Sequence, residues 1–409
     1  PGPVSRERAT TLAVLGVSTV EGPPADALAE LVAGADLVVP SPGVPRRHPA
    51  TVLALAAGTP VATEFELAAW WSDVPVVAVT GTNGKTTVTT LVTDMLARSG
   101  RRVVAAGNND LPLVDAIDDV GLDLVVVEAS SFRLEFTERF HPVVGTWLNL
   151  APDHLDWHED MEAYAAAKEV IWANADSTDV AVANAEDPVV LAAAESSSAR
   201  VVTFGLAAGD WRVDDELLVG PGGPFLAVAE LRRALPHDRT NALAAAATAT
   251  AAGADPDAVQ AALRSFRGLP HRLALVGEHD GVRWLDDSKA TDPHAALAAV
   301  RGFDDVVLIA GGRNKGLDLS VLAEEASRLR AVVAIGEAAA EVAAAFASTG
   351  VPVREAGSMD DAVRLAREVA RPGDAVLLSP GCASYDWYSA YGERGDDFAR
   401  AVRAELAGA

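Results

Sequence analysis

The segment Gly81-Thr-Asn-Gly-Lys-Thr-Thr87 places glycines, a lysine and hydroxyl side chains between a short apolar run at 75–80 and an amphipathic stretch. Glycines let backbone N–H groups converge, and the start of a helix favours an anion. Lys85 would then reach the β- and γ-phosphates of a nucleotide, and the Thr86 hydroxyl would reach Mg²⁺. The strict phosphate-loop pattern is not met, because Val79 stands where its first glycine belongs. A glycine-rich turn that only caps a helix is the alternative, but the flanking elements favour phosphate binding.

Lysine is rare in this chain. Four lysines occur, and the remaining 29 basic residues are arginines. Because arginine serves nearly everywhere else, the surviving lysines indicate places that need a compact ammonium group or an amine that can lose its proton. Chance survival is the alternative. The four positions are Lys85, Lys168, Lys289 and Lys315.

Candidate metal and ligand groups follow apolar runs. Glu128 comes directly after the run 124–127, and a carboxylate at the end of a buried strand is where α/β folds place ligand-facing groups. Such oxygen ligands suit Mg²⁺. His154 follows the run 143–150, but a lone histidine is more simply explained as a satisfied structural residue. The segment Asp286-Asp-Ser-Lys289 is either a ligand-binding loop or a solvated charged turn.

Composition narrows the class of protein. The chain has 409 residues, half of them hydrophobic, and a formal net charge of −25. This acidic balance argues against nucleic acid or an anionic membrane surface as the main partner. The single cysteine, Cys382, excludes an internal disulfide framework and fits a reducing cytoplasm. No apolar stretch is long enough to span a bilayer, so we expect no membrane insertion.

The elements that must position these groups read as an α/β fold, because short β-branched runs alternate with Ala- and Leu-rich segments of helical period. Strands are predicted at 37–39, 76–79, 124–127, 143–148, 180–182, 306–310, 331–335 and 375–378. Helices are predicted at 25–33, 86–99, 161–173, 241–252, 256–265, 319–327, 338–346 and 360–369. The stretch 220–224 is predicted to be a loop or hairpin end. Turns near 72–75 and 267–270 predict domains at 1–74, 75–268 and 269–409.

Residues 80–87 resemble the ATP loop of the Mur ligase superfamily, and the resemblance runs from about residue 25 to the C-terminus. Several further blocks, in the same order, carry it: Gly107-Asn-Asn-Asp-Leu-Pro112, Glu128-Ala-Ser-Ser-Phe-Arg-Leu-Glu135, Asp153-His-Leu-Asp156, Tyr164-Ala-Ala-Ala-Lys168, Gly268-Leu-Pro-His-Arg272, Asp286-Asp-Ser-Lys-Ala-Thr291, Gly311-Gly-Arg-Asn-Lys315 and Leu378-Ser-Pro-Gly-Cys-Ala-Ser384. The resemblance implies three domains: a truncated Rossmann-like N-terminal unit for the UDP substrate, a central P-loop-type mononucleotide-binding ATPase domain, and a C-terminal Rossmann-like α/β domain for the amino acid and nucleotide.

The blocks are closest to superfamily members that add D-glutamate to UDP-N-acetylmuramoyl-L-alanine in peptidoglycan precursor synthesis. The implied activity is an ATP-dependent amide ligation through an acyl phosphate, by a cytoplasmic monomer. Two alternatives remain: a superfamily ligase that uses another amino acid, such as L-glutamate, and a non-catalytic nucleotide-binding remnant.

The resemblance also implies roles for particular residues. ATP would be bound by Gly81, Thr82, Asn83, Gly84, Lys85, Thr86, Thr87, Asn241, Arg272 and Asp287. Two Mg²⁺ ions would be held by Thr86, Glu128 and His154, and Lys168 would be carbamylated by CO₂; the catalytic set is Lys85, Lys168, Glu128 and His154. The substrates would be bound by Gly43, Asn108, Ser130, Arg133, Lys289, Thr291, Lys315, Ser384, Tyr385 and Tyr391. Core packing is the alternative for Tyr391.

Some positions depart from the superfamily pattern. Residues 37–44 match only the later part of the N-terminal domain, with Gly43 near the uracil, so we expect its first strand, glycine-rich loop and helix to be missing. Arg133 stands where a glutamine is usual, Arg313 replaces an acidic residue, and Asp238 replaces an asparagine near the adenine.

Overall fold

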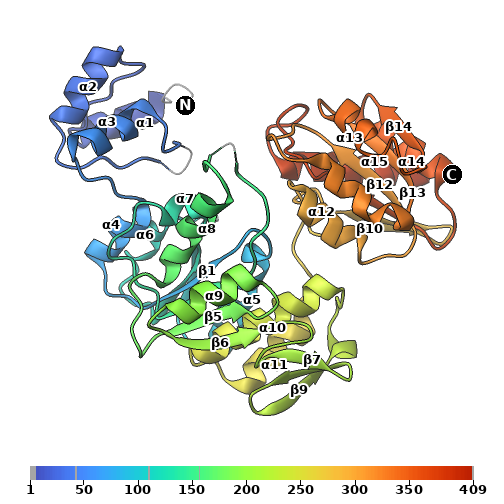
Figure 1. Cartoon of the computed structure of the whole chain (residues 1–409), viewed down its shortest axis with the longest axis horizontal. Helices are drawn as coiled ribbons and strands as arrows, with labels where there is room; N and C mark the ends of the chain where they lie inside the picture. Colours follow the sequence, from blue (N-terminus) through green and yellow to red (C-terminus); the bar gives the residue numbers. More distant parts are fainter. Residues whose placement is uncertain (1–5, 42–43, 109–110, 156, 408–409) are drawn as a thin grey trace.

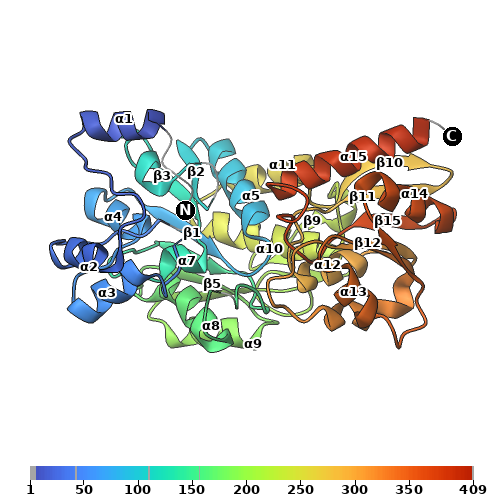
Figure 2. The same ribbon diagram turned by 90° about the horizontal axis from the view of Figure 1, so that it is seen from above.

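The computed structural model describes residues 6–41, 44–108, 111–155 and 157–407. Three successive parts of the chain follow one another along the molecule, with the N-terminal helices at one end and the C-terminal sheet at the other (Figure 1, Figure 2). Gly43, which is expected near the uracil, lies outside the described residues.

The first part is mostly helical in the described residues, with α1 (Arg6–Val14), α2 (Ala25–Ala33) and α3 (Pro49–Ala57). The predicted strand at 37–39 is wrong as a strand, because only an isolated parallel bridge joins Val38 to Val61. Helix α4 (Glu64–Trp71) precedes the expected boundary near residue 74, yet its Phe65 is fully buried in the core of the next part.

The central part is built on a six-stranded parallel sheet of order β2-β3-β1-β4-β5-β6. Its strands are β1 (Val76–Thr80), β2 (Val103–Gly107), β3 (Leu124–Glu128), β4 (Val144–Trp147), β5 (Val180–Asn184) and β6 (Arg200–Phe204). In this order β2 and β3 lie on one side of β1, and β4, β5 and β6 lie on the other. The chain therefore reverses its direction across the sheet between β3 and β4. In open α/β sheets this reversal, beyond the carboxyl ends of the strands, is where ligands bind.

Alternating residues of β1 enter opposite cores, as the two-residue period of a strand requires. Val77 and Val79 pack with α5 (Lys85–Arg98), α10 (Pro236–Ala251) and α11 (Pro256–Ser265), whereas Ala78 faces the core on the other side of the sheet. That opposite core takes residues from α4, α6 (Leu113–Ala116), α9 (Pro188–Ser196) and the 3₁₀ helix η1 (Val170–Trp172). The helices α7 (Ser131–Leu134) and α8 (Met161–Glu169) lie against each other beside the sheet.

A small antiparallel sheet follows, with β7 (Arg212–Asp214), β8 (Leu217–Gly220) and β9 (Gly223–Ala227) in that order. Gly220 pairs with Gly223, so the predicted hairpin end at 220–224 is confirmed. The 3₁₀ helix η2 (Val228–Glu230) then leads toward α10. Helix α10 begins at Pro236, five residues before the predicted start, with proline in its first turn where a missing N–H costs nothing.

The C-terminal part has a second six-stranded sheet of order β10-β11-β15-β12-β13-β14, in which only β10 is antiparallel to its neighbour. Its strands are β10 (Ala274–His279), β11 (Val282–Asp286), β12 (Val306–Gly311), β13 (Leu329–Ile335), β14 (Val353–Ala356) and β15 (Ala375–Leu378). One face packs on α12 (Pro293–Val300), η3 (Leu319–Arg328) and α13 (Ala339–Ala345), and the other on α14 (Met359–Val369) and α15 (Tyr391–Ala407). The helix predicted at 319–327 is a 3₁₀ segment that kinks at Glu325.

Candidate functional site

The glycine loop lies between the end of β1 and the start of α5. Gly81 and Gly84 have φ angles of 148° and 88°, which residues with a Cβ rarely adopt. A Cβ added to Gly84 would come within 2.5 Å of the side-chain oxygen of Asn241, which lies on α10. The loop therefore needs glycine both for its backbone conformation and for the close approach of Asn241.

Two lysines meet at this loop. Lys85 Nζ donates hydrogen bonds to the carbonyl oxygens of Gly81 and Thr82, both at 2.8 Å. Lys168 Nζ, from α8, donates to the same Gly81 oxygen at 2.9 Å and lies 4.4 Å from the ring centre of Tyr164. Burial is the main cause that lowers the pKa of both amines, and the nearby charge of Lys85 lowers the pKa of Lys168 further.

Glu128 ends β3, where the apolar run predicted a ligand-facing carboxylate. Its Oε1 accepts a hydrogen bond from Asn108 Nδ2 at 3.0 Å. Asn108 in turn accepts from Arg133 at 2.6 Å, and Arg133 is paired with Glu64 at 2.6 Å. Within the described part of the chain, Oε2 of Glu128 is buried and has no hydrogen-bond partner. An unpaired buried carboxylate oxygen is an available acceptor for a cation.

His154 lies between an acid and a cation. Its Nε2 is 3.2 Å from Asp153, whose other oxygen is 3.6 Å from Lys315 Nζ of the C-terminal part. Burial lowers the pKa of His154 to about 4; Asp153 opposes this shift and Lys315 adds to it. The imidazole is therefore neutral near pH 7, with a ring nitrogen lone pair that can accept a proton or a metal ion.

Thr86 receives two cationic groups from the C-terminal part. Its Oγ1 accepts hydrogen bonds from Lys289 Nζ at 3.1 Å and from Arg272 Nη2 at 3.4 Å. With Lys315 near His154 and Lys168 beside Lys85, all four lysines lie around one junction between the two large sheets. The four scarce lysines therefore share one region of the fold, and their individual roles remain predictions.

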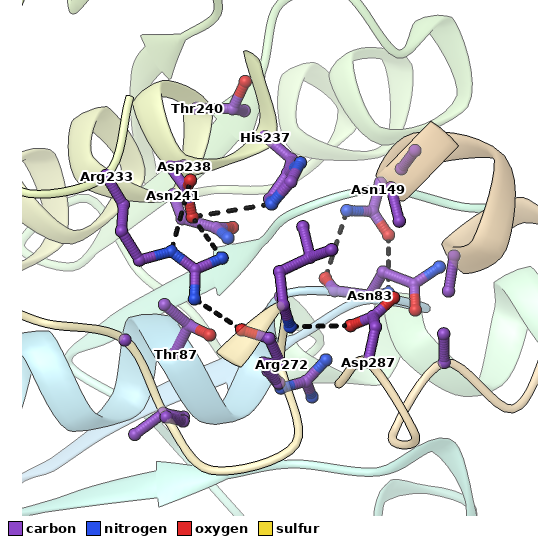
Figure 3. Close-up of a pocket in the computed structure, with 18 of the residues that line it drawn as sticks. Asn83, Thr87, Asn149, Arg233, His237, Asp238, Thr240, Asn241, Arg272 and Asp287 are labelled. Carbon is purple, nitrogen blue, oxygen red and sulfur yellow. Dashed lines mark hydrogen bonds and ion pairs between the residues drawn. The ribbon is translucent and has the colours of Figure 1, made fainter. Parts of the chain in front are cut away.

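A cavity of about 280 Å³ adjoins the glycine loop (Figure 3). The predicted nucleotide residues that line it are Asn83, Gly84, Thr87, Asn241, Arg272 and Asp287; Gly81, Thr82, Lys85 and Thr86 belong to the loop but not to the lining. The lining also includes apolar residues such as Phe266, Leu269 and Ala299, against which a flat aromatic group could pack. These apolar residues, and Arg233 and His237, were missed because nothing in their local sequence distinguishes them from packing residues.

Asp287 lies in the wall of this cavity. Its Oδ1 accepts from the backbone N–H of Leu273 at 3.1 Å and its Oδ2 accepts from the Ser379 hydroxyl at 2.7 Å. Burial raises the pKa of Asp287 to about 7, although these hydrogen bonds and Arg272 oppose the shift. Each carboxylate oxygen has a further lone pair that could accept a hydrogen bond, and the contact with ribose hydroxyls stays a prediction.

The residues expected to bind the substrates are spread over several loops. Ser130 and Ser384 are buried, Thr291 is partly buried, and Tyr385 is 62% exposed. Tyr391 is 38% exposed and its ring centre lies 5.3 Å from Lys289 Nζ, so the core-packing alternative is wrong. Lys289 contacts Thr86, and Lys315 lies near Asp153, so both lysines reach residues of the central part.

Arg394 on α15 is a structural residue that the sequence analysis missed. It is 1% exposed and donates hydrogen bonds to the hydroxyl and carbonyl oxygens of Ser288 and to the carbonyl oxygen of Cys382. It thus joins the loop that carries Lys289 to the loop that carries Ser384. No pattern in the sequence signals this role, because the contacts are made only after α15 packs on the sheet.

The described residues contain no group of three or more His, Cys, Asp or Glu side chains arranged to hold a metal ion. A cation here would instead rely on the single unpaired oxygen of Glu128 with neutral donors such as Thr86 and His154. In the same described portion, no helix is both long and apolar enough to cross a membrane.

Comparisons with known proteins agree on one family. Residues 79–249 match the model described as Mur ligase middle domain, and residues 271–382 match the one described as Mur ligase, glutamate ligase domain. A relative from Frankia casuarinae, named UDP-N-acetylmuramoylalanine--D-glutamate ligase, is 48% identical over 381 residues, covering 90% of this chain and 80% of the relative. A Thermobifida fusca relative of the same name is 41% identical, covering 99% and 91%.

Solved structures share the fold at lower identity. The MurF ligase of Thermotoga maritima in complex with ADP has a TM-score of 0.64 at 18% identity, covering 100% of this chain and 88% of that one. UDP-N-acetylmuramate-alanine ligase MurC from the same organism has a TM-score of 0.62 at 20% identity, covering 98% and 91%. These likenesses confirm an α/β fold with parallel sheets.

Proposed function

The chain belongs to the Mur ligase family, and we infer that it is an ATP-dependent ligase that joins D-glutamate to UDP-N-acetylmuramoyl-L-alanine in peptidoglycan precursor synthesis. Relatives with this name match 90% or more of the chain at 41–48% identity. The structural observation that carries the inference is a pair of hydrogen bonds to Thr86 of the glycine loop. Their donors, Lys289 and Arg272, belong to the C-terminal part. A nucleotide phosphate on that loop would be surrounded by cations from both parts.

The reaction we propose has two steps. A carboxylate oxygen of the alanyl group attacks the γ-phosphorus of ATP, the bond to the bridging oxygen breaks, and ADP leaves. The amine of D-glutamate then attacks the acyl carbon, an amide bond forms, the amine loses a proton, and inorganic phosphate leaves. Cationic side chains lower the energy of the charge on the transferring phosphoryl group. Closure around the reactants excludes water, which would hydrolyse the acyl phosphate.

We assign Lys85 to the phosphates. Its amine already binds the Gly81 and Thr82 carbonyls at the centre of the loop, so it is held where the phosphates would arrive. The adenine and ribose would occupy the cavity between Asn241, Arg272 and Asp287 (Figure 3). The lining combines apolar residues with polar groups, which suit a base and a sugar, respectively.

Two Mg²⁺ ions are part of the proposal. The residues present fit a cation at Glu128, whose Oε2 is buried and unpaired among the described residues, whereas Thr86 Oγ1 accepts hydrogen bonds from Lys289 and Arg272 in this structure. Thr86 would hold one ion, and Glu128 and His154 the other. When bound, Mg²⁺ supplies positive charge to the phosphate oxygens.

Lys168 is proposed to be carbamylated. Burial and the nearby Lys85 lower the pKa of Lys168, which favours the neutral amine that can attack CO₂. The Lys168 nitrogen would form a bond to the carbon of CO₂ and release a proton to solvent, which leaves a carbamate anion beside Lys85. Its charge would then complement the cations of the loop.

The acidic amino acid is proposed to bind near Lys289, Thr291, Lys315, Ser384, Tyr385 and Tyr391. The support is chemical: D-glutamate carries two carboxylates, and these residues supply ammonium and hydroxyl donors. Asn108, Ser130, Arg133 and Gly43 are proposed for the UDP-sugar substrate, although Arg133 is engaged with Glu64 and Asn108 in this structure.

We also propose three domains close to the predicted division 1–74, 75–268 and 269–409, but with the first boundary moved to before residue 64, because Phe65 of α4 packs in the core of the central domain. The first domain is proposed to be the Rossmann-like unit for the UDP substrate. A cytoplasmic monomer is proposed as well, and the single cysteine supports a reducing compartment. Light scattering and cell fractionation test these two points.

A panel of amino acids tests the function. The protein is incubated with ATP, Mg²⁺, UDP-N-acetylmuramoyl-L-alanine and one amino acid, and products are identified by mass spectrometry. We expect a dipeptidyl product and stoichiometric phosphate with D-glutamate only. Turnover with L-glutamate or another amino acid, and none with D-glutamate, would contradict the assignment, and ATP binding without any product would favour the remnant.

A further inference from the structure

Arg233, on the segment that leads into α10, and Asp238, in the first turn of α10, form an ion pair in the wall of the proposed nucleotide cavity (Figure 3). Arg233 Nη2 lies 3.3 Å from Asp238 Oδ1, and Nε lies 3.5 Å from Oδ2. The side chains are 19% and 11% exposed, respectively, so the pair is largely withdrawn from water. Asp238 Oδ2 also accepts from the backbone N–H of Leu235 at 3.3 Å, which fixes the carboxylate at the start of the helix.

Arg233 reaches beyond this pair to the segment that connects the two large sheets. Its Nη1 donates a hydrogen bond to the carbonyl oxygen of Arg272. Gly268, at the other end of the segment, has a φ of 91°, and a Cβ added there would collide with the Arg233 guanidinium. The connecting segment 268–272 therefore passes directly over the Arg233 side chain. The C-terminal residue of this segment, Arg272, accepts a hydrogen bond from Arg233.

The backbone that Arg233 holds carries a side chain of the phosphate site. Arg272 Nη2 donates to Thr86 Oγ1 at 3.4 Å, and the next residue, Leu273, donates its N–H to Asp287 at 3.1 Å. A shift of the Arg272 backbone would move both contacts together. Arg233 is thus linked, through one carbonyl, to groups on the phosphate side and the ribose side of the cavity.

The charge of Arg233 has a second consequence. Asp238 places a carboxylate in the wall of a cavity proposed to receive an anionic nucleotide. His237 Nε2 lies 3.5 Å from Asp238, but burial lowers the pKa of His237, which disfavours its cationic form. Arg233 is therefore the cation that compensates Asp238, and without it a carboxylate would repel the phosphates.

We propose that Arg233 is a positioning residue for the nucleotide: anchored by Asp238, it holds segment 268–272 so that Arg272 faces the phosphate loop, and it neutralises Asp238. The inference goes beyond the proposed function but rests on ATP binding. An asparagine at position 238 would need no such partner, so the arginine and the aspartate act as a matched pair in this chain.

Binding of ADP to the purified full chain, measured by calorimetry, tests the proposal. Arg233→Ala should weaken ADP binding about tenfold, which corresponds to about 1.4 kcal/mol. The matched control is Arg232→Ala, which removes the same charge from a neighbouring exposed arginine and should stay within about twofold of the wild type. The KM for ATP should rise with the ADP dissociation constant, while the KM for D-glutamate stays unchanged.

A rescue experiment separates positioning from a merely structural contribution. In the Arg233→Ala background, Asp238→Asn removes the uncompensated charge and should restore part of the lost ADP affinity. Arg233→Lys should be intermediate, because one ammonium group cannot match both the carbonyl and the carboxylate as the planar guanidinium does. If Arg233→Ala does not fold, ADP binding by Arg233→Lys and by Asp238→Asn alone still tests the proposal.

The outcomes are distinct. Equal ADP affinity of Arg233→Ala and Arg232→Ala, or a lower melting temperature with unchanged ADP affinity, would overturn the inference and leave the proposed function standing. Absence of rescue by Asp238→Asn would overturn the charge argument. If the wild type and Arg232→Ala bind no ADP, the proposed function itself fails.

Discussion

Lys85 and Lys168 donate hydrogen bonds to the same carbonyl oxygen, that of Gly81, although they lie on different helices and 83 positions apart in the sequence. Two ammonium groups on one acceptor repel each other, and the repulsion is strong where water is excluded. Burial and this repulsion lower the pKa of Lys168, which is 1% exposed, well below its usual value, and burial also lowers the pKa of Lys85.

Lys168→Ala should reduce turnover by about a hundredfold or more, because the proposed carbamate would be lost. Short carboxylic acids such as acetate or formate should restore part of the rate, since their carboxylate can occupy the vacated space. Lys168→Arg is the control, because it keeps the positive charge and cannot be rescued. Initial rates with and without the acid measure the effect, and wild-type turnover in Lys168→Ala would refute the carbamate.

Lys85→Ala should abolish turnover and weaken ADP binding, because the cation at the centre of the glycine loop is removed. A loss of about 10²-fold or more in kcat with a native circular dichroism spectrum would support the role. If the variant unfolds instead, Lys85 is mainly holding the Gly81 and Thr82 carbonyls. Lys85→Arg keeps the charge but changes its shape, and it should also be strongly impaired.

Central strands were easier to predict than edge strands. The predicted strands correspond to β1, β3, β4 and β5 in one sheet and to β12, β13 and β15 in the other. The strands that were not predicted include the edge strands of both sheets. These are β2 and β6 in the sheet of the central part, and β10 and β14 in the sheet of the C-terminal part. Central parallel strands are buried on both faces and read as apolar runs, whereas edge strands carry more exposed residues.

The site was predicted in part. Lysine scarcity pointed to four residues that the fold brings to one junction, and composition could reveal them because it does not depend on a local pattern. The partners could not be predicted: Asp153 beside Lys315 and Arg233 beside Arg272 are set by how two domains meet. Arg394 is a further example, since its acceptors lie about 106 and 12 positions away in the chain.

Arg394→Ala should destabilise the C-terminal domain by about 2–4 kcal/mol, because buried acceptors at Ser288 and Cys382 would lose their donor. The hydrogen bonds that join the loop of Lys289 to the loop of Ser384 would also be lost. The KM for D-glutamate should therefore rise more than the KM for ATP. Urea denaturation and steady-state kinetics measure the two effects. Arg400→Ala, an exposed arginine on the same helix, is the control and should change neither by much.

His154 should make the stability of the metal-free protein depend on pH. Its pKa is about 4 when folded and 6.5 in the unfolded reference, so between these values the unfolded chain binds more protons. Stability from this group is fully present above about pH 6.5 and is lost as the pH falls toward 4, by at most about 3 kcal/mol. His154→Gln cannot be protonated, so its free energy of unfolding should fall less than that of the wild type between pH 7 and pH 4. Parallel pH curves for the two proteins would show that His154 is not held neutral by its surroundings.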